Sequence, residues 1–81
     1  MNVYRKTFVA VCPNDGEAII YDLKIQTDRT IYVENINTAT ALIKIGFQEV
    51  IADDLYRQFG GLQTIQATHQ GVDLTTIRGG R

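Results

Sequence analysis

The sequence predicts one α+β domain in which a four-stranded sheet packs on one or two helices. Two patterns favour this fold class: apolar residues alternate with polar ones near both ends of the chain, as in strands, and recur every three to four residues in the middle, as in a helix. The 81 residues suit a single small domain with one modest core. The predicted order is hairpin, helical centre and hairpin, which gives two layers.

The first 28 residues are predicted to form a long β-hairpin. In its first strand, Tyr4, Phe8 and Ala10 share one face with Cys12, while valines occupy the other face. Because both faces carry apolar groups, we expect a central strand that is partly covered on each side. A turn follows at residues 13–16, where proline and glycine supply the backbone angles of a tight connection.

The return strand has one apolar face and one polar face. Its apolar residues recur with a period of two: Ile19, Tyr21, Leu23 and Ile25. The residues between them include Asp22 and Lys24, so we expect this strand to bury one face and expose the other.

The helical centre contains one ambiguous segment and one clear helix. Residues 29–36 suit either a short strand or the approach to a helix, and Asn35 or Asn37 is a candidate helix cap. A stripe at helical spacing follows, and Gly60 and Gly61 end it. The stripe consists of Phe47, Val50, Ile51, Leu55 and Phe59.

The last residues return to strand patterns and form the second predicted hairpin. Residues 62–68 and 72–77 are strands, and His69, Gln70 and Gly71 form the loop between them. We therefore expect a single globular domain over residues 1–77. Residues 78–81 hold two glycines and no apolar side chain, so we expect a flexible, exposed tail.

Composition argues against several functional classes. Eight basic and nine acidic residues give a net charge of −1, which disfavours electrostatic binding of nucleic acid. No apolar run approaches the length of a membrane span, and no signal region follows Arg5 and Lys6. The single cysteine agrees with a reducing compartment, so we expect a cytoplasmic protein that does not bind membranes.

No constellation of residues predicts an active site. A cysteine–histidine pair would need Cys12 and His69 together, and they come from opposite ends of the chain. We interpret Cys12 as a small buried hydrophobe and His69 as a polar loop residue. No metal-ligand spacing is present, and no cofactor is expected. An enzyme is the least favoured class, to be reconsidered only if Cys12 and His69 share a pocket.

The end of the chain carries the most specific motif. The final predicted strand runs directly into Arg78-Gly79-Gly80, with Arg81 after it. This resembles the end of ubiquitin-like protein modifiers, in which a last strand leads to an Arg-Gly-Gly tail. The order of elements is also similar to the β-grasp fold of that family.

The resemblance implies a non-enzymatic modifier that joins target proteins by an isopeptide bond. Gly80 would be the conjugated terminus, Gly79 would let the tail enter a narrow channel, and Arg78 would be recognised by charge-assisted hydrogen bonds. A peptidase would first remove Arg81. The implied partners are activating and carrier enzymes, the trimming peptidase and the targets.

Two alternatives remain from the residues themselves. The first is a small protein-binding inhibitor of the phage anti-defence type, which would contact its target through Tyr4, Tyr32 and Tyr56. The second is a self-associating structural subunit, in which an edge strand of either hairpin pairs with another copy to form a homo-oligomer.

Overall fold

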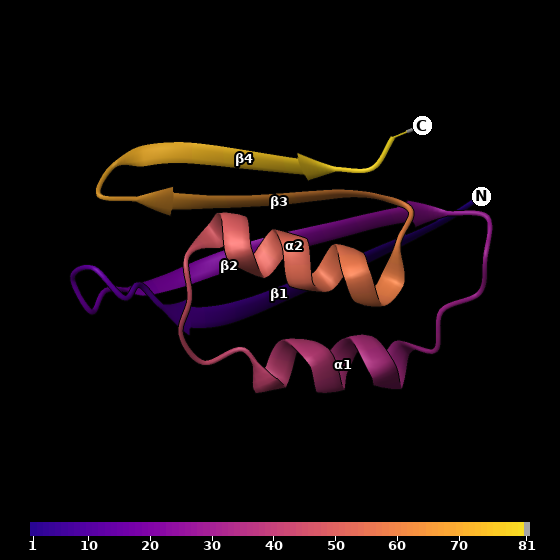
Figure 1. The fold of residues 1–81 in the computed structure, drawn as a ribbon, viewed down its shortest axis with the longest axis horizontal. Helices are drawn as coiled ribbons and strands as arrows, with labels where there is room; N and C mark the ends of the chain where they lie inside the picture. The colour runs from indigo at the N-terminus through magenta and orange to yellow at the C-terminus, as the bar shows by residue number, and fades with distance from the viewer. Residues whose placement is uncertain (81) are drawn as a thin grey trace.

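The chain folds as two layers, a four-stranded sheet and a pair of helices that cover one of its faces (Figure 1). The computed structural model describes residues 1–80. The elements in chain order are β1 (Asn2–Val11), β2 (Ala18–Thr27), α1 (Val33–Leu42), α2 (Gln48–Phe59), β3 (Leu62–His69) and β4 (Val72–Arg78). Both predicted hairpins, the predicted α2 helix and the α+β class are confirmed.

The strands lie in sequence order, β1-β2-β3-β4, and every neighbouring pair is antiparallel. This sequential order does not confirm a β-grasp arrangement. The interpretation of β1 as a central strand was wrong, because β1 and β4 are the two edges of the sheet. Val3 and Val9 on the outer face of β1 are 49% and 55% exposed, so apolar residues on both faces did not mean cover on both faces.

The core lies between the inner face of the sheet and the two helices. Tyr21, Leu23 and Ile25 of β2 are at most 2% exposed, and Leu55 of α2 is fully buried against the same layer. Burying each such side chain contributes about 1.5–3 kcal/mol, which makes the alternation in β2 the strongest determinant of which face packs inward. The predicted apolar face of β2 is therefore confirmed, and on its other face Asp22 is exposed while Lys24 is half-buried.

The two helices begin differently from the sequence prediction. Helix α1 starts after Tyr32, and neither Asn35 nor Asn37 caps it, because both lie inside the helix. Helix α2 starts after Phe47, which also makes no side-chain cap. Phe47 and Val50 at this start are about half exposed, whereas the later residues of the predicted stripe are buried in the core.

A tight turn closes the second hairpin. Gln70 and Gly71 both have positive φ, +49° and +79°, as a two-residue hairpin turn requires. The predicted loop was one residue longer, because His69 proves to be the last residue of β3. Within residues 1–80, neither helix is long and apolar enough to cross a membrane.

Candidate functional site

The antiparallel sheet brings the ends of β1 and β3 together at one end of the molecule. Cys12 directly follows β1, and His69 closes β3. The linker between the helices reaches the same end, where the Val11 amide donates to the Lys44 carbonyl (2.9 Å) and the Gly46 amide donates to the Val11 carbonyl (3.2 Å). These bonds hold the residue before Cys12 against the approach to α2.

A pocket of about 240 Å³ opens at this end. It is lined by Cys12, Gly46, Phe47, Gln48, Glu49, His69, Val72 and Leu74. A larger hollow of about 620 Å³ lies on the uncovered sheet face, but its lining includes neither Cys12 nor His69. The smaller pocket therefore contains the chain's only cysteine and only histidine, which the sequence analysis did not expect to meet.

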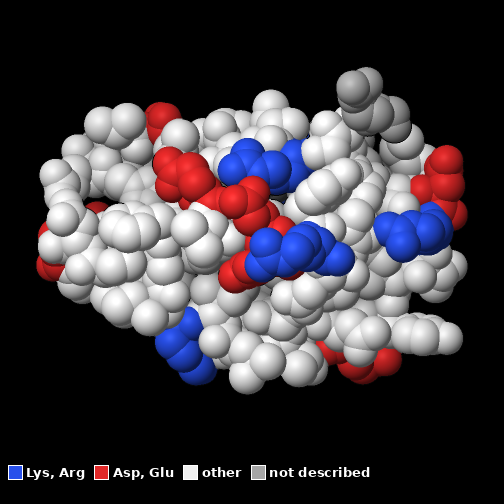
Figure 2. Space-filling view, viewed as in Figure 1, with Lys and Arg blue, Asp and Glu red and all other residues white. Residues whose placement is uncertain are grey.

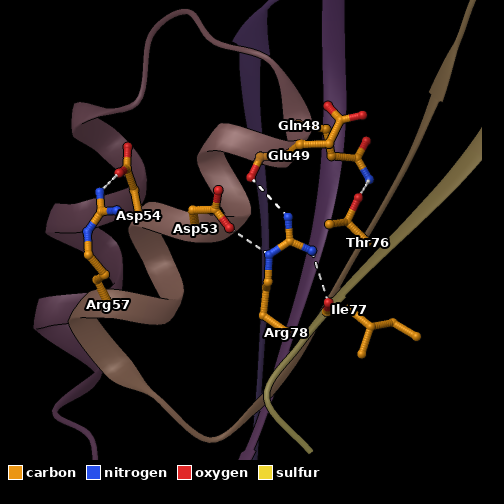
Figure 3. Close-up of polar contacts among 8 residues, drawn as sticks. All are labelled: Gln48, Glu49, Asp53, Asp54, Arg57, Thr76, Ile77 and Arg78. Atoms are coloured by element: carbon orange, nitrogen blue, oxygen red, sulfur yellow. Dashed lines mark hydrogen bonds and ion pairs between the residues drawn. The ribbon is translucent and has the colours of Figure 1, made fainter.

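Gln48 connects the start of α2 to His69 and to the second hairpin. Its side chain is 1% exposed. The amide nitrogen lies 3.1 Å from the carbonyl oxygens of Ile65 and Leu74. It lies at the same distance from the Thr76 hydroxyl, and Figure 3 shows this contact. The amide oxygen lies 2.7 Å from His69 Nε2. The imidazole thus has a buried partner that fixes its orientation.

Asp15 links the tips of the two hairpins beside Cys12. Its carboxylate accepts a hydrogen bond from the Glu17 amide (3.0 Å) and another from the Gln70 side chain (2.6 Å). These two bonds, the Glu17 amide first, lower the pKa of the Asp15 carboxyl from its ordinary value. The turn that carries Cys12 is therefore tied to the turn that follows His69.

Tyr21 is a buried core residue that contacts His69 at this end of the molecule. Its ring stacks on Phe8 with centroids 5.3 Å apart and meets the edge of His69 at 5.9 Å. Among residues 1–80, no protein group forms a hydrogen bond with its buried hydroxyl. Burial raises the pKa of Tyr21, and the charges of Cys12 and Glu49 raise it further.

The mouth of the pocket combines an aromatic ring with a carboxylate. Phe47 is 51% exposed, and Glu49 is also exposed in the first turn of α2. Such a pair offers a flat apolar surface and an acceptor for N–H groups. The described part of the chain holds no group of three acidic, histidine or cysteine residues that could bind a metal ion.

The residues predicted for conjugation lie at the opposite end of the sheet. Arg78 is the last residue of β4, and its Nε lies 2.6 Å from the Asp53 carboxylate on α2 (Figure 3). Gly79, at φ +81°, packs so closely on Gly61 that a Cβ there would overlap the Gly61 carbonyl oxygen. Gly80 follows beside Leu62, and Arg81 lies outside the described residues.

The three predicted partner-contact tyrosines also lie toward that opposite end, but they differ in exposure. Tyr32 is 70% exposed and Tyr56 39%, whereas Tyr4 is half-buried and its hydroxyl accepts a hydrogen bond from the Ile31 amide. The helix face drawn in Figure 2 carries acidic and basic atoms side by side near its centre. Arg57 and Asp54 form one such ion pair on α2.

Comparisons with known proteins bear on the fold. No protein-family model matches the chain. No curated protein matches it by sequence. A solved structure, the crystal structure of the archaeosine synthase QueF-Like in the apo form, superimposes with a TM-score of 0.76 at 14% identity and covers 99% of this chain and 94% of its own.

At this identity the likeness shows a shared fold. The similar protein is named as a synthase, so the comparison does not support the expectation of a non-enzymatic protein. Sequence reasoning also missed Gln48, which it did not single out. The available signal was a polar residue, Gln48, directly after the first apolar residue of the α2 stripe.

Proposed function

We propose that this chain is an enzyme that uses Cys12 as a nucleophile and His69 as its base. One observation carries the proposal: the only cysteine and only histidine of the chain line one small pocket, with Gln48 buried behind the imidazole. Nucleophile, base and a third group that orients the base are the parts that cysteine catalysis requires.

The chemistry that these groups can perform is addition of a thiol to an electrophilic carbon. His69 accepts the thiol proton directly or through one water, and the sulfur electron pair forms a bond to the carbon. The electrophilic carbon is one that shares a multiple bond with a nitrogen or oxygen atom. One electron pair of that bond moves onto the nitrogen or oxygen, which then takes the proton from the imidazolium. The product of this step is a covalent adduct on Cys12 that retains every atom of the substrate.

The pocket mouth favours a small, flat, nitrogen-containing substrate. The Phe47 ring can stack on a planar group, and the Glu49 carboxylate can accept two N–H donors from one edge of a heterocycle. The pocket volume of about 240 Å³ also limits the substrate to a small molecule. The name of the structurally similar protein, an archaeosine synthase, supports a nucleoside or its base as the first ligand to examine.

Protection of Cys12 tests this function. The protein is treated with iodoacetamide in the presence of archaeosine, its free base or cytidine, and the alkylated fraction is followed by intact mass. We expect archaeosine or its base to slow alkylation of Cys12, and Glu49→Gln to weaken that protection. Equal rates with every ligand, or equal protection by cytidine, would refute archaeosine or its base as a ligand of this pocket.

Self-association is a second proposal, favoured by the edges of the sheet. Strands β1 and β4 run in opposite directions and lie at opposite edges, so β4 of one copy can pair antiparallel with β1 of the next and continue the sheet. Val9 and Ile77 are exposed near these edges, at 55% and 58%. Light scattering tests this proposal.

Conjugation through Gly80 and target inhibition through the tyrosines stay predictions. The packing of Gly79 on Gly61 gives the double glycine a role within the fold. For conjugation, trimming of Arg81 followed by an isopeptide bond from Gly80 would be visible as a branched peptide in the native host's proteome. For inhibition, replacing exposed Tyr32 would weaken a specific complex.

A further inference from the structure

The hydrogen-bond pattern around Gln48 fixes which way its amide points. Its nitrogen lies 3.1 Å from two backbone carbonyl oxygens, those of Ile65 and Leu74. Carbonyl oxygens only accept hydrogen bonds, so the NH₂ group must face them. The reverse orientation would place three acceptor oxygens together in a buried site, at a cost of about 1–3 kcal/mol for each unsatisfied group.

This orientation decides the protonation of His69. The Gln48 amide oxygen, which can only accept, lies 2.7 Å from His69 Nε2. Nε2 must therefore carry the hydrogen, and in a neutral imidazole the lone pair is then on Nδ1. Among the hydrogen bonds of residues 1–80, none engages Nδ1, and the half-buried ring belongs to the pocket lining.

We propose that Gln48 is a positioning residue that holds His69 as its Nε2–H form and leaves Nδ1 as the base for Cys12. The role of Nδ1 as a base rests on the proposed function, whereas the protonation pattern depends only on the Gln48 contacts. The carbonyls of Ile65 in β3 and Leu74 in β4 orient the Gln48 amide. The second hairpin therefore determines, through Gln48, which ring nitrogen of His69 carries the hydrogen.

Nitrogen NMR tests the protonation pattern directly, because His69 is the chain's only histidine. Long-range ¹H–¹⁵N spectra of the labelled full chain, recorded where the ring is neutral, should show Nε2 with a pyrrole-type shift and Nδ1 with a pyridine-type shift. The proton on Nε2 should exchange slowly enough to give its own signal. A pyrrole-type Nδ1 would overturn the proposal.

Two matched variants separate positioning from folding. Gln48→Met keeps the length of the side chain but removes the amide, so the Nε2 proton signal should disappear and alkylation of Cys12 by iodoacetamide should slow by about tenfold or more. Thr76→Val removes one acceptor but leaves both carbonyls, so it should keep the signal and the rate. A protected Nε2 proton in Gln48→Met, or its loss in Thr76→Val, would overturn the proposal.

The measurements also distinguish this inference from the proposed function. If Gln48→Met fails to fold, the wild-type spectrum and Thr76→Val still decide the protonation of His69. If the spectrum is as expected but Cys12 of the native protein reacts no faster than in the unfolded chain, the positioning holds and the enzymatic role of Cys12 fails.

Discussion

Tyr21 shows at the residue scale how the site end of the core differs from a purely apolar core. A phenylalanine would provide the same stacking on Phe8 and the same edge contact with His69 without burying a hydroxyl. No group within residues 1–80 pairs with that hydroxyl, so its burial lowers the free energy of unfolding. Packing alone therefore does not explain why this position carries a hydroxyl.

We predict that Tyr21→Phe leaves the free energy of unfolding at neutral pH unchanged or raises it by up to about 1 kcal/mol. The raised pKa means that the folded state holds the phenol proton more tightly than the unfolded state. Proton binding by the Tyr21 phenol therefore stabilises the folded state fully at pH values below the ordinary pKa of 10.0. This stabilisation is lost as pH rises from that value through the raised pKa of the folded state.

Urea titrations of both proteins at about pH 8 and about pH 11 check this prediction, since the wild type should lose more stability than the variant over that interval. Tyr4→Phe is the matched control: it removes the acceptor of the Ile31 amide and should cost about 1 kcal/mol at about pH 8. A loss above about 2 kcal/mol in Tyr21→Phe would show that its hydroxyl has a partner in the folded protein.

Asp15 gives a pH dependence of the opposite sign. Its pKa is lowered chiefly by the Glu17 amide and then by Gln70, so its charged form stabilises the folded state above the ordinary value of 3.8. That stabilisation is lost as pH falls through the lowered pKa. We predict that the difference in thermal midpoint between wild type and Asp15→Asn is present near neutral pH and vanishes in acid. A difference that grows in acid would contradict this sign.

At the element scale, the close approach of β4 and the α2–β3 turn explains the glycines that resemble a modifier tail. Gly79 and Gly61 both have positive φ, and their backbones meet at the exit from β4. Gly79→Ala should destabilise the fold by about 1–3 kcal/mol, because the new Cβ is strained and also overlaps the Gly61 carbonyl.

Gly71→Ala is the matched control for this substitution. Its φ is nearly the same, +79° against +81°, but no atom lies within 4 Å of the added Cβ. It should cost only the backbone term, about 1 kcal/mol. Thermal unfolding of both variants measures the difference. Equal costs would show that Gly79 does not pack on Gly61, and the conjugation hypothesis would regain its simplest explanation of the glycines.

The elements themselves could be predicted because their patterns are local. Strand β2 alternates cleanly, and the residues of α2 from Ile51 onward recur at helical spacing. The edge position of β1 could not be predicted, because Val3 and Val9 are apolar yet exposed and only the strand order reveals it. The prediction of an asparagine cap was wrong because α1 begins after Tyr32, whose side chain makes no capping hydrogen bond.

At the scale of the whole molecule, the candidate site depends on topology that no local pattern contains. Cys12 and His69 line the same pocket because the antiparallel order brings the ends of β1 and β3 to one end of the sheet. Gln48 joins this lining because the linker between the helices pairs with the end of β1. Each of these residues has an ordinary local explanation in the sequence. Their combined chemistry appears only when the strand order is known.

Self-association is also a prediction at this scale. Light scattering of the purified chain should give a multiple of the 9.1 kDa monomer mass. Replacing Val9 or Ile77 by lysine places a charge near an edge and should shift the protein toward monomer. Ile20→Lys is the matched control, because Ile20 is equally exposed but belongs to the inner strand β2. A monomer in the wild type would refute the prediction.

The reactivity of Cys12 tests the central claim most directly. The rate at which iodoacetamide alkylates the single cysteine is measured at neutral pH for the wild type, for His69→Asn and for the chain unfolded in urea. If Cys12 is a nucleophile served by His69, the wild type should react about tenfold faster or more than both references. Equal rates in wild type and His69→Asn would contradict a cysteine–histidine enzyme and leave the pocket without a catalytic role.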